Sequence, residues 1–181
     1  MRAINKEKPV LVTGAGGYIA SWIVLQLLEK GITVHGMVRN PDNHEKTKHL
    51  KQLEQDYPGK LKLFEADLLQ EKSFDKAMQD CELVIHTASP FLIGKISNPQ
   101  KQLIEPAVEG TRNVLDAANR ISSVKRVVLT SSVVAVYGDA IDLENSKKDK
   151  FNEQDWNLTS TQSHQPYNYS KVMAEREAWK I

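Results

Sequence analysis

Short runs of apolar, mostly β-branched residues recur along the chain, with helix-like segments between them. They lie near residues 9–14, 32–38, 60–65, 82–88 and 125–131 and predict five strands. Strands that are apolar on both faces and alternate with helices are typical of a parallel sheet that is covered on each side. The pattern therefore predicts an α/β, doubly wound Rossmann fold with the strand order 3-2-1-4-5 and right-handed crossovers.

Local signals place the helices between these strands. After the first strand, apolar residues repeat at helical spacing, and Gly31 should end that helix after Lys30. A later helix should begin with Asn98 as its cap and Pro99 in its first turn, and Pro106 should kink it. Residues 139–165 show no clear period, and loops of such length are often functional.

Length and composition exclude several classes of protein. A chain of 181 residues is the size of one domain, and a net charge of +1 with interspersed signs argues against nucleic acid as a partner. Cys81 is the single cysteine, so no internal disulfide can form. No apolar run is long enough to span a membrane, and the polar start is unlike a signal peptide. We assign no metal site and expect a cytoplasmic protein with a small-molecule partner.

The stretch VTGAGGYIAS, residues 12–21, lies where the first strand should pass into the first helix. Gly14 can make the tight turn out of the strand, Gly17 lets a pyrophosphate approach the helix N-terminus, and Ala20 lets the helix pack close to the sheet. A glycine motif alone is a weak signal, but four further strand–helix units follow this one. We therefore interpret it as a dinucleotide-binding turn, with Tyr18 and Ile19 as further cofactor contacts.

The end of the second strand indicates which dinucleotide is bound. The sequence there is MVRN, so Arg39 stands where an acidic residue would bind the ribose hydroxyls of NAD. A guanidinium can instead bind the 2′-phosphate of NADP, and Lys46 can add a second positive charge. The sequence thus favours NADP. A solvated helix lysine is an equally good interpretation of Lys46.

Further cofactor contacts are expected after the third and fourth strands. Asp67 can accept a hydrogen bond from an adenine amino group, although with Gln70 it also resembles a capping pair for the next helix. Small Ala88 should leave space for the nicotinamide ribose. We also assign Leu68 and Thr87 to cofactor binding. We interpret His86 as a core residue whose side chain is hydrogen-bonded, rather than as a catalyst, and Cys81 as a structural residue.

Tyr167 and Lys171 lie four residues apart at the start of a predicted helix, so both side chains share one face. A fixed ammonium favours the phenolate form of a neighbouring tyrosine, and such a pair can protonate a carbonyl as hydride arrives. Ser131 and Ser132 follow the fifth strand, and one hydroxyl there can donate to the substrate oxygen. Alternation does not decide which serine faces inward, and the other should be a turn or cap residue.

Together, VTGAGGYIASWIV, Arg39, ADL, TSS and YNYSK resemble an extended short-chain dehydrogenase/reductase of the dihydroflavonol reductase and cinnamoyl-CoA reductase-like group. The resemblance covers almost the whole chain and implies an NADPH-dependent reduction of an aldehyde or ketone. It implies that Ser132 polarises the carbonyl, that Tyr167 donates the proton, and that Lys171 tunes the tyrosine and holds the nicotinamide ribose. Related enzymes often form homodimers through the helices corresponding to 99–120 and 167–180, and the sequence leaves the oligomeric state open.

One departure from the family pattern concerns the C-terminal end. Family members continue into a sixth strand, a nicotinamide-contacting loop and a small substrate domain, whereas this sequence stops ten residues after Lys171. We therefore expect residues 1–181 to form an NADP-binding Rossmann domain that lacks these parts, with little or no turnover of its own.

Three alternatives remain at this point. The first is a nucleotide-binding module without turnover, and the second is a nucleotide-sugar epimerase or dehydratase, against which Arg39 argues. The third is a methyltransferase-type Rossmann domain, which would not explain the Tyr167 and Lys171 pair. No residue identifies the substrate, although an apolar wall of Phe91, Leu92 and Ile93 would fit aromatic or aliphatic carbonyl compounds.

Overall fold

The computed structural model describes residues 3–92 and 96–181, and Ile93 therefore lies outside the described residues. These residues form two compact units. The sheet unit comprises Met1–Ala88 and Asn113–Thr130, and the helical unit comprises Ser89–Arg112 and Ser131–Ile181. The expectation that residues 1–181 make a single Rossmann domain stays a prediction.

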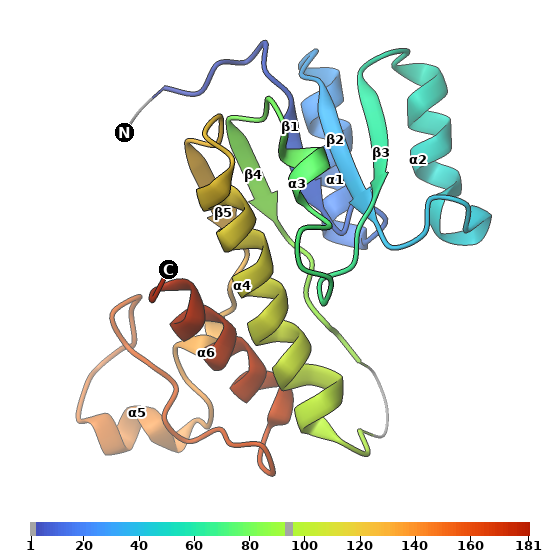
Figure 1. Ribbon diagram of the computed structural model, residues 1–181. Helices are drawn as coiled ribbons and strands as arrows, with labels where there is room; N and C mark the ends of the chain where they lie inside the picture. The colour runs from blue at the N-terminus through green and yellow to red at the C-terminus, as the bar shows by residue number, and fades with distance from the viewer. Residues whose placement is uncertain (1–2, 93–95) are drawn as a thin grey trace. The chain divides into compact units, whose positions relative to one another are not determined.

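The sheet unit contains one parallel sheet in the order β3-β2-β1-β4-β5, which confirms the predicted fold (Figure 1). In each neighbouring pair the strands are in parallel register, with Val10 opposite both Val34 and Leu83. Their carboxyl ends therefore meet at one edge of the sheet, which is where ligands bind in folds of this type. The strands are β1 (Val10–Thr13), β2 (Val34–Val38), β3 (Leu61–Glu65), β4 (Leu83–His86) and β5 (Arg126–Leu129).

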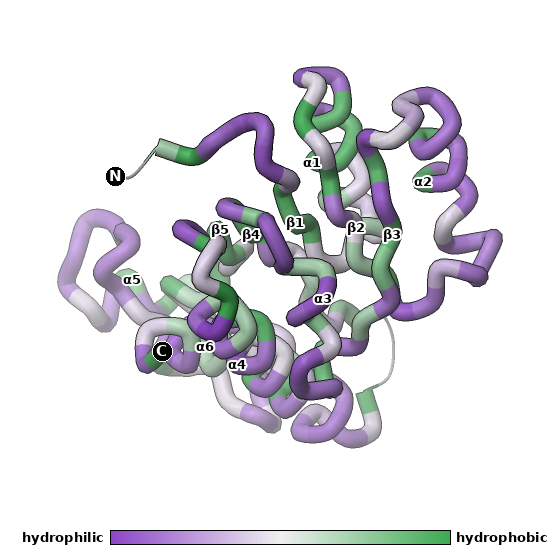
Figure 2. Tube along the Cα trace, turned by 45° about the horizontal axis from the view of Figure 1, so that its top comes forward, coloured by the Kyte–Doolittle hydropathy of each residue, from purple (hydrophilic) through white to green (hydrophobic). Residues whose placement is uncertain are grey.

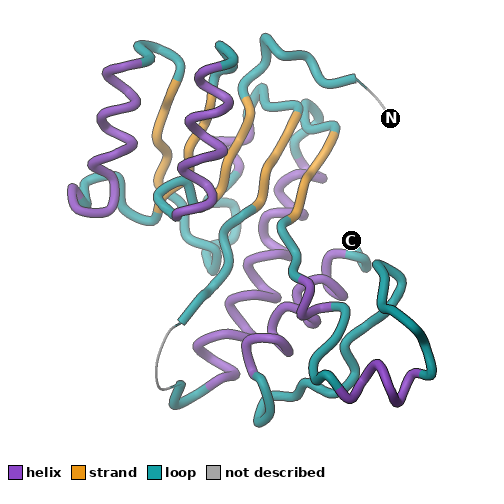
Figure 3. Tube along the Cα trace, turned by 180° about the vertical axis from the view of Figure 1, so that it is seen from behind, coloured by secondary structure: helices purple, strands orange, loops and turns teal. Residues whose placement is uncertain are grey.

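Helices cover both faces of this sheet because successive residues of its strands point to opposite sides. Val10 and Val12 of β1 pack in a core with α1 (Tyr18–Glu29) and α2 (His44–Asp56). Leu11 packs in a second core with α3 (Asp75–Met78) and the end of α4 (Glu105–Arg120). Seen from behind, the strands lie side by side between these helices (Figure 3). Hydropathy follows the same arrangement, since β1 is hydrophobic and most of α2 is hydrophilic (Figure 2).

The helical unit is built around α6 (Pro166–Ala178), which packs against two short helices. One is the π-helix η1 (Gln100–Ile104), which leads into α4, and the other is the 3-10 helix η2 (Val133–Ala135). The unit also contains α5 (Ile141–Ser146). An ion pair joins α6 to α4, because Nη2 of Arg112 lies 2.7 Å from Oε1 of Glu177.

Two local predictions are confirmed, and one alternative interpretation is corrected. Gly31 follows the C-cap of α1 with a φ of +73°, as predicted. The Asn98 side chain caps the amide of Lys101 at 3.1 Å, also as predicted. The turn before Pro106 is π-helical, which suits a residue that has no N–H to donate, and the kink at Pro106 stays a prediction. The helix expected directly after Asp67 begins instead at Asp75.

Candidate functional site

The glycine turn leaves the carboxyl end of β1 and enters α1 directly. Gly14 has a φ of +67°, which a residue with a side chain rarely adopts. A Cβ added at Gly14 would lie 3.1 Å from the Cα and Cβ of Ala88, and one at Gly17 would lie 3.2 Å from the Gly14 carbonyl oxygen. The backbone therefore turns more tightly here than other residues allow, as a dinucleotide-binding turn requires.

Thr13 holds the segment after β4 against this turn. Its hydroxyl oxygen accepts the backbone N–H groups of Thr87 (3.2 Å) and Ala88 (3.1 Å), and it lies 2.7 Å from Nδ1 of His86. The Thr87 hydroxyl in turn donates to the Thr13 carbonyl oxygen at 2.6 Å. His86 is therefore a buried, hydrogen-bonded core residue, as predicted, and small Ala88 closes tightly on Gly14.

The first turn of α1 presents unpaired backbone donors. The N-cap residue Gly17 provides no side-chain cap, and the first turn carries no acidic residue. The first N–H groups of a helix have no partner within it, so this end favours an anion. Tyr18 and Ile19, both assigned to cofactor binding, are 82% and 60% exposed, so neither is committed to the core.

The two basic residues of the predicted NADP site lie at the same edge of the sheet. Arg39 directly follows β2 and is exposed, and Lys46 is exposed in the first turn of α2. The backbone of Lys46 passes close to the glycine turn, because a Cβ at Gly16 would lie 3.1 Å from the Lys46 carbonyl oxygen. Neither side chain forms an ion pair with another described residue, so both charges are available to a phosphate.

Asp67 lies two residues beyond β3, at the same edge, and is not a helix cap. One carboxylate oxygen accepts the Leu69 amide at 2.8 Å, and the Asp67 carbonyl accepts the Ser73 hydroxyl at 2.9 Å. The alternative interpretation, in which Asp67 and Gln70 form a capping pair for the next helix, is therefore wrong. The Leu68 carbonyl accepts the side-chain amide of Asn113 at 2.7 Å, which fixes the backbone of this segment.

In the helical unit, α6 carries both members of the predicted catalytic pair. Tyr167 lies in the first turn of α6 with Lys171 one turn later, as their spacing predicted. The ring of Phe91 meets that of Tyr167 edge to face, with centroids 5.3 Å apart. The side chain of Lys171 is buried, and this burial lowers the pKa of the ammonium, while the charge of Glu175 opposes the shift.

The two candidate serines have different environments. The Ser131 hydroxyl donates to the Glu175 carboxylate. The Ser132 oxygen accepts the Val134 amide at 3.3 Å and so caps η2. The Ser132 O–H has no acceptor among the residues that the structure describes. It can therefore donate a hydrogen bond to a bound molecule. The structure thus places both serines in hydrogen bonds, and Ser132 retains an available donor.

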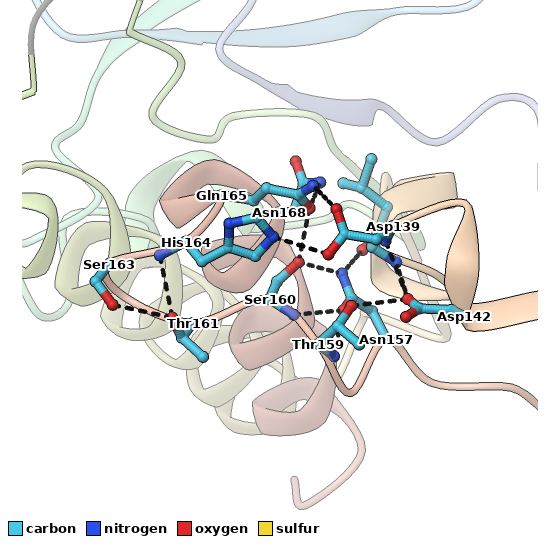
Figure 4. Close-up of polar contacts among 12 residues, drawn as sticks. Asp139, Asp142, Asn157, Thr159, Ser160, Thr161, Ser163, His164, Gln165 and Asn168 are labelled. Atoms are coloured by element: carbon cyan, nitrogen blue, oxygen red, sulfur yellow. Dashed lines mark hydrogen bonds and ion pairs between the residues drawn. The ribbon is translucent and has the colours of Figure 1, made fainter. Parts of the chain in front are cut away.

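A polar cluster surrounds the start of α6 (Figure 4). Gln165 has a left-handed backbone, and its side chain donates to Asp139 at 2.6 Å and accepts from Ser160 at 3.0 Å and Asn168 at 2.7 Å. His164 contacts the other Asp139 oxygen at 2.8 Å. These bonds fix the chain directly before Tyr167.

The same cluster reaches the segment that follows the serines. The side-chain NH₂ group of Asn157 donates to the backbone carbonyl of Val134 at 2.8 Å. The backbone N–H of Asn157 donates to the backbone carbonyl of Ala135, also at 2.8 Å. The part of the chain that had no sequence period therefore links η2 to the start of α6.

Sequence reasoning missed these linking residues and Glu175. The cluster consists of polar residues without periodicity, so no pattern in residues 139–165 pointed to specific partners. Glu175 did carry a signal, because it stands four residues after Lys171 and so lies on the same helix face.

Three further findings concern the residues that the structure describes. Cys81 is fully buried, and burial raises the pKa of its thiol to about 12, so it is a poor nucleophile. Among the residues that the structure describes, no group of His, Cys, Asp and Glu side chains is arranged to hold a metal ion. In the same residues, no helix combines the length and the apolar character needed to cross a membrane.

Comparisons with known proteins identify the family and relatives of this chain. Residues 10–181 match the model of the NAD dependent epimerase/dehydratase family. Cinnamoyl-CoA reductase CAD2 of Medicago truncatula is 43% identical over 100% of this chain and 55% of its own length. Dihydroflavonol 4-reductase of Gerbera hybrida is 38% identical over 94% of this chain and 46% of its own length.

A solved structure shows the same arrangement. Yeast methylglyoxal/isovaleraldehyde reductase Gre2, which was crystallised with NADPH, matches with a TM-score of 0.79 and 35% identity over 95% of this chain and 52% of its own. The chain thus spans about half the length of these relatives.

Proposed function

The chain belongs to the NAD dependent epimerase/dehydratase family, and we propose that it is the cofactor-binding part of an NADPH-dependent reductase. The reaction would reduce an aldehyde or ketone to the alcohol, with Tyr167 as the proton donor. The reductase names of the relatives, together with NADPH in the yeast structure, support this function over that of an epimerase.

The observation that carries the proposal is the edge formed by the carboxyl ends of β1, β2 and β3. In the glycine turn there, a Cβ at Gly14 would meet Ala88 at 3.1 Å on a left-handed backbone, and the N-terminus of α1, which has no side-chain cap, follows it. Arg39 stands one residue beyond β2 without an ion-pair partner among the described residues, where a carboxylate would favour NAD. These features fit a dinucleotide that carries a 2′-phosphate.

When bound, NADPH supplies the hydride. The proposed role of Ser132 follows from its free O–H donor, which can hydrogen-bond to the substrate carbonyl and stabilise negative charge on its oxygen. The Tyr167 hydroxyl then gives its proton to that oxygen. Lys171, one turn along α6, favours the resulting phenolate through its charge and is assigned to the nicotinamide ribose.

The surroundings of Tyr167 support an apolar substrate. Phe91 meets the tyrosine ring edge to face and is largely exposed, and Leu92 beside it is exposed as well. Aromatic and aliphatic side chains of this kind bind apolar groups and leave a carbonyl to the polar residues. We therefore propose an aromatic or aliphatic aldehyde or ketone as the substrate class.

The proposal is tested by assaying a panel of such carbonyl compounds for loss of NADPH absorbance, with the 181-residue chain and with the complete gene product. Direct titration measures NADPH binding by the same samples. We expect binding by both and carbonyl-dependent oxidation by the complete gene product. Binding without oxidation of NADPH by any compound would support the nucleotide-binding module instead, and absence of binding would overturn both functions.

A further inference from the structure

Glu175 of α6 is attached to the serine segment but has no role in the proposed reaction. One of its carboxylate oxygens accepts the Ser131 hydroxyl, and the other accepts the indole N–H of Trp179 at 3.4 Å. Ser131 directly precedes the residue that caps η2. The bond therefore connects the middle of α6 to the backbone that holds Ser132.

Glu175 also faces the ammonium that precedes it on α6. Lys171 and Glu175 are separated by four residues of one helix, so their side chains are neighbours. Lys171 is only 6% exposed, and a buried ammonium is costly unless a negative charge compensates it. Burial lowers the pKa of the Lys171 ammonium, and the charge of Glu175 acts in the opposite direction.

The other charged residues of the elements packed around Lys171 have their own partners or lie further along the helices. On α6, Glu177 bonds to Arg112 and to Lys180, and Arg176 lies over the ring of Trp156. On the neighbouring η1 and α4, Lys101 and Glu105 are exposed. Glu175 is therefore placed to act on both the serine segment and the ammonium.

We propose that Glu175 is a positioning residue, whose carboxylate ties the Ser131 segment to α6 and serves as the counter-charge of the buried Lys171. This inference rests on the proposed function in so far as Ser132 and Lys171 take part in the reaction. It assigns Ser131 to the tether, and so leaves Ser132 as the donor to substrate.

Two variants of the 181-residue chain separate the two roles. Glu175→Gln removes the charge but keeps the size and an oxygen acceptor, whereas Ser131→Ala removes the hydroxyl and keeps the charge. Glu177→Gln is the matched control, because it makes the same change of charge two residues away on α6, where the side chain bonds elsewhere. The readouts are the pKa of Lys171, from NMR of ¹³C-labelled lysine, and hydrogen exchange of the η2 amides.

We expect Glu175→Gln to lower the pKa of Lys171, while Ser131→Ala and Glu177→Gln leave it unchanged. Ser131→Ala should speed exchange at Val134 and Ala135 by about tenfold, as the loss of one hydrogen bond implies. If the pKa of Lys171 is unchanged in Glu175→Gln, or falls equally in Glu177→Gln, Glu175 is not the counter-charge of Lys171. If hydrogen exchange at Val134 and Ala135 is unchanged in Ser131→Ala, the bond from Ser131 to Glu175 does not hold this segment. No cofactor or substrate is present, so these results do not depend on whether the protein is a reductase.

Discussion

The edge of the sheet unit and the start of α6 are both fixed in place, but by different means. At the sheet edge the backbone conformation fixes the structure, because Gly14 turns tightly against Ala88 and the parallel strands bring their carboxyl ends together. At the start of α6, side-chain hydrogen bonds fix the chain, since Gln165 is hydrogen-bonded to Asp139, Ser160 and Asn168. The sheet edge should therefore be sensitive to added Cβ atoms, and the start of α6 should be sensitive to lost or displaced polar groups.

The largest effect is expected at Tyr167, where the change removes one hydroxyl. In the complete gene product, Tyr167→Phe should lower kcat by at least about 10²-fold, as the loss of a general acid does. NADPH affinity should stay nearly unchanged, because the phosphate contacts belong to the sheet unit. Steady-state kinetics and NADPH titration measure the two quantities, and near-normal turnover would show that another residue is the acid.

Lys171 and the two serines sharpen this result. Lys171→Met should lower kcat and NADPH affinity together, since the ammonium is assigned both to Tyr167 and to the ribose. Ser132→Ala should lower kcat far more than Ser131→Ala, because Ser131 donates to Glu175 and Ser132 keeps a free proton. The reverse ranking in the same assay would move the carbonyl donor to Ser131.

The next effect concerns the glycine turn and has a control within the chain. Gly14→Ala should destabilise the fold by more than Gly31→Ala, for which the left-handed backbone costs about 1–2 kcal/mol. Both glycines have positive φ, but a Cβ meets Ala88 at 3.1 Å at position 14 and nothing within 4 Å at position 31. Urea unfolding measures the difference, and equal losses would show that the close approach to Ala88 is unimportant.

A smaller loss is expected in the polar cluster. A Cβ at Gly138 would lie 2.5 Å from the Thr159 hydroxyl oxygen, 2.7 Å from the side-chain oxygen Oδ1 of Asn157 and 2.8 Å from the Ser160 hydroxyl oxygen. Gly138→Ala should therefore displace these side chains and cost about 1–3 kcal/mol, as overpacking does. Faster hydrogen exchange should be confined to η2 and the start of α6. Unchanged exchange there would mean that the cluster does not hold these segments.

The smallest effect concerns Cys81 and alkaline pH. Its pKa is raised to about 12 in the folded state, whereas an unfolded thiol titrates near roughly 8.5. Above that pH the unfolded chain loses its proton first, so the thiol lowers stability as pH rises towards 12. Cys81→Ala should remove this component, so the urea midpoint of the native chain should fall more steeply between neutral and alkaline pH than that of the variant. Identical slopes would contradict the raised pKa.

The same contrast explains what sequence reasoning could predict. Apolar strand runs and the glycine turn are local signals, and they gave the sheet order and the common edge of Gly14, Arg39 and Asp67. The one local error there was the helix after Asp67, because a single carboxylate can bond to an amide in a turn as well as in a cap.

On α6, the one-turn spacing of Tyr167 and Lys171 could be predicted because helical periodicity is a local signal. The bonds of Ser131 to Glu175 and of Asp139 to Gln165 join residues that lie 44 and 26 positions apart, and no local pattern encodes such contacts.

The central claim, that the sheet edge binds NADPH, is tested most directly by titrating NADPH and NADH into the 181-residue chain and its Arg39→Asp variant. We predict that the variant binds NADPH at least about tenfold more weakly, a loss of about 1.4 kcal/mol, and NADH nearly as well as before. Lys48→Asp, the same change of charge at an exposed position of α2, should leave both affinities unchanged. An equal loss for both cofactors, or no NADPH binding by the unaltered chain, would contradict the account.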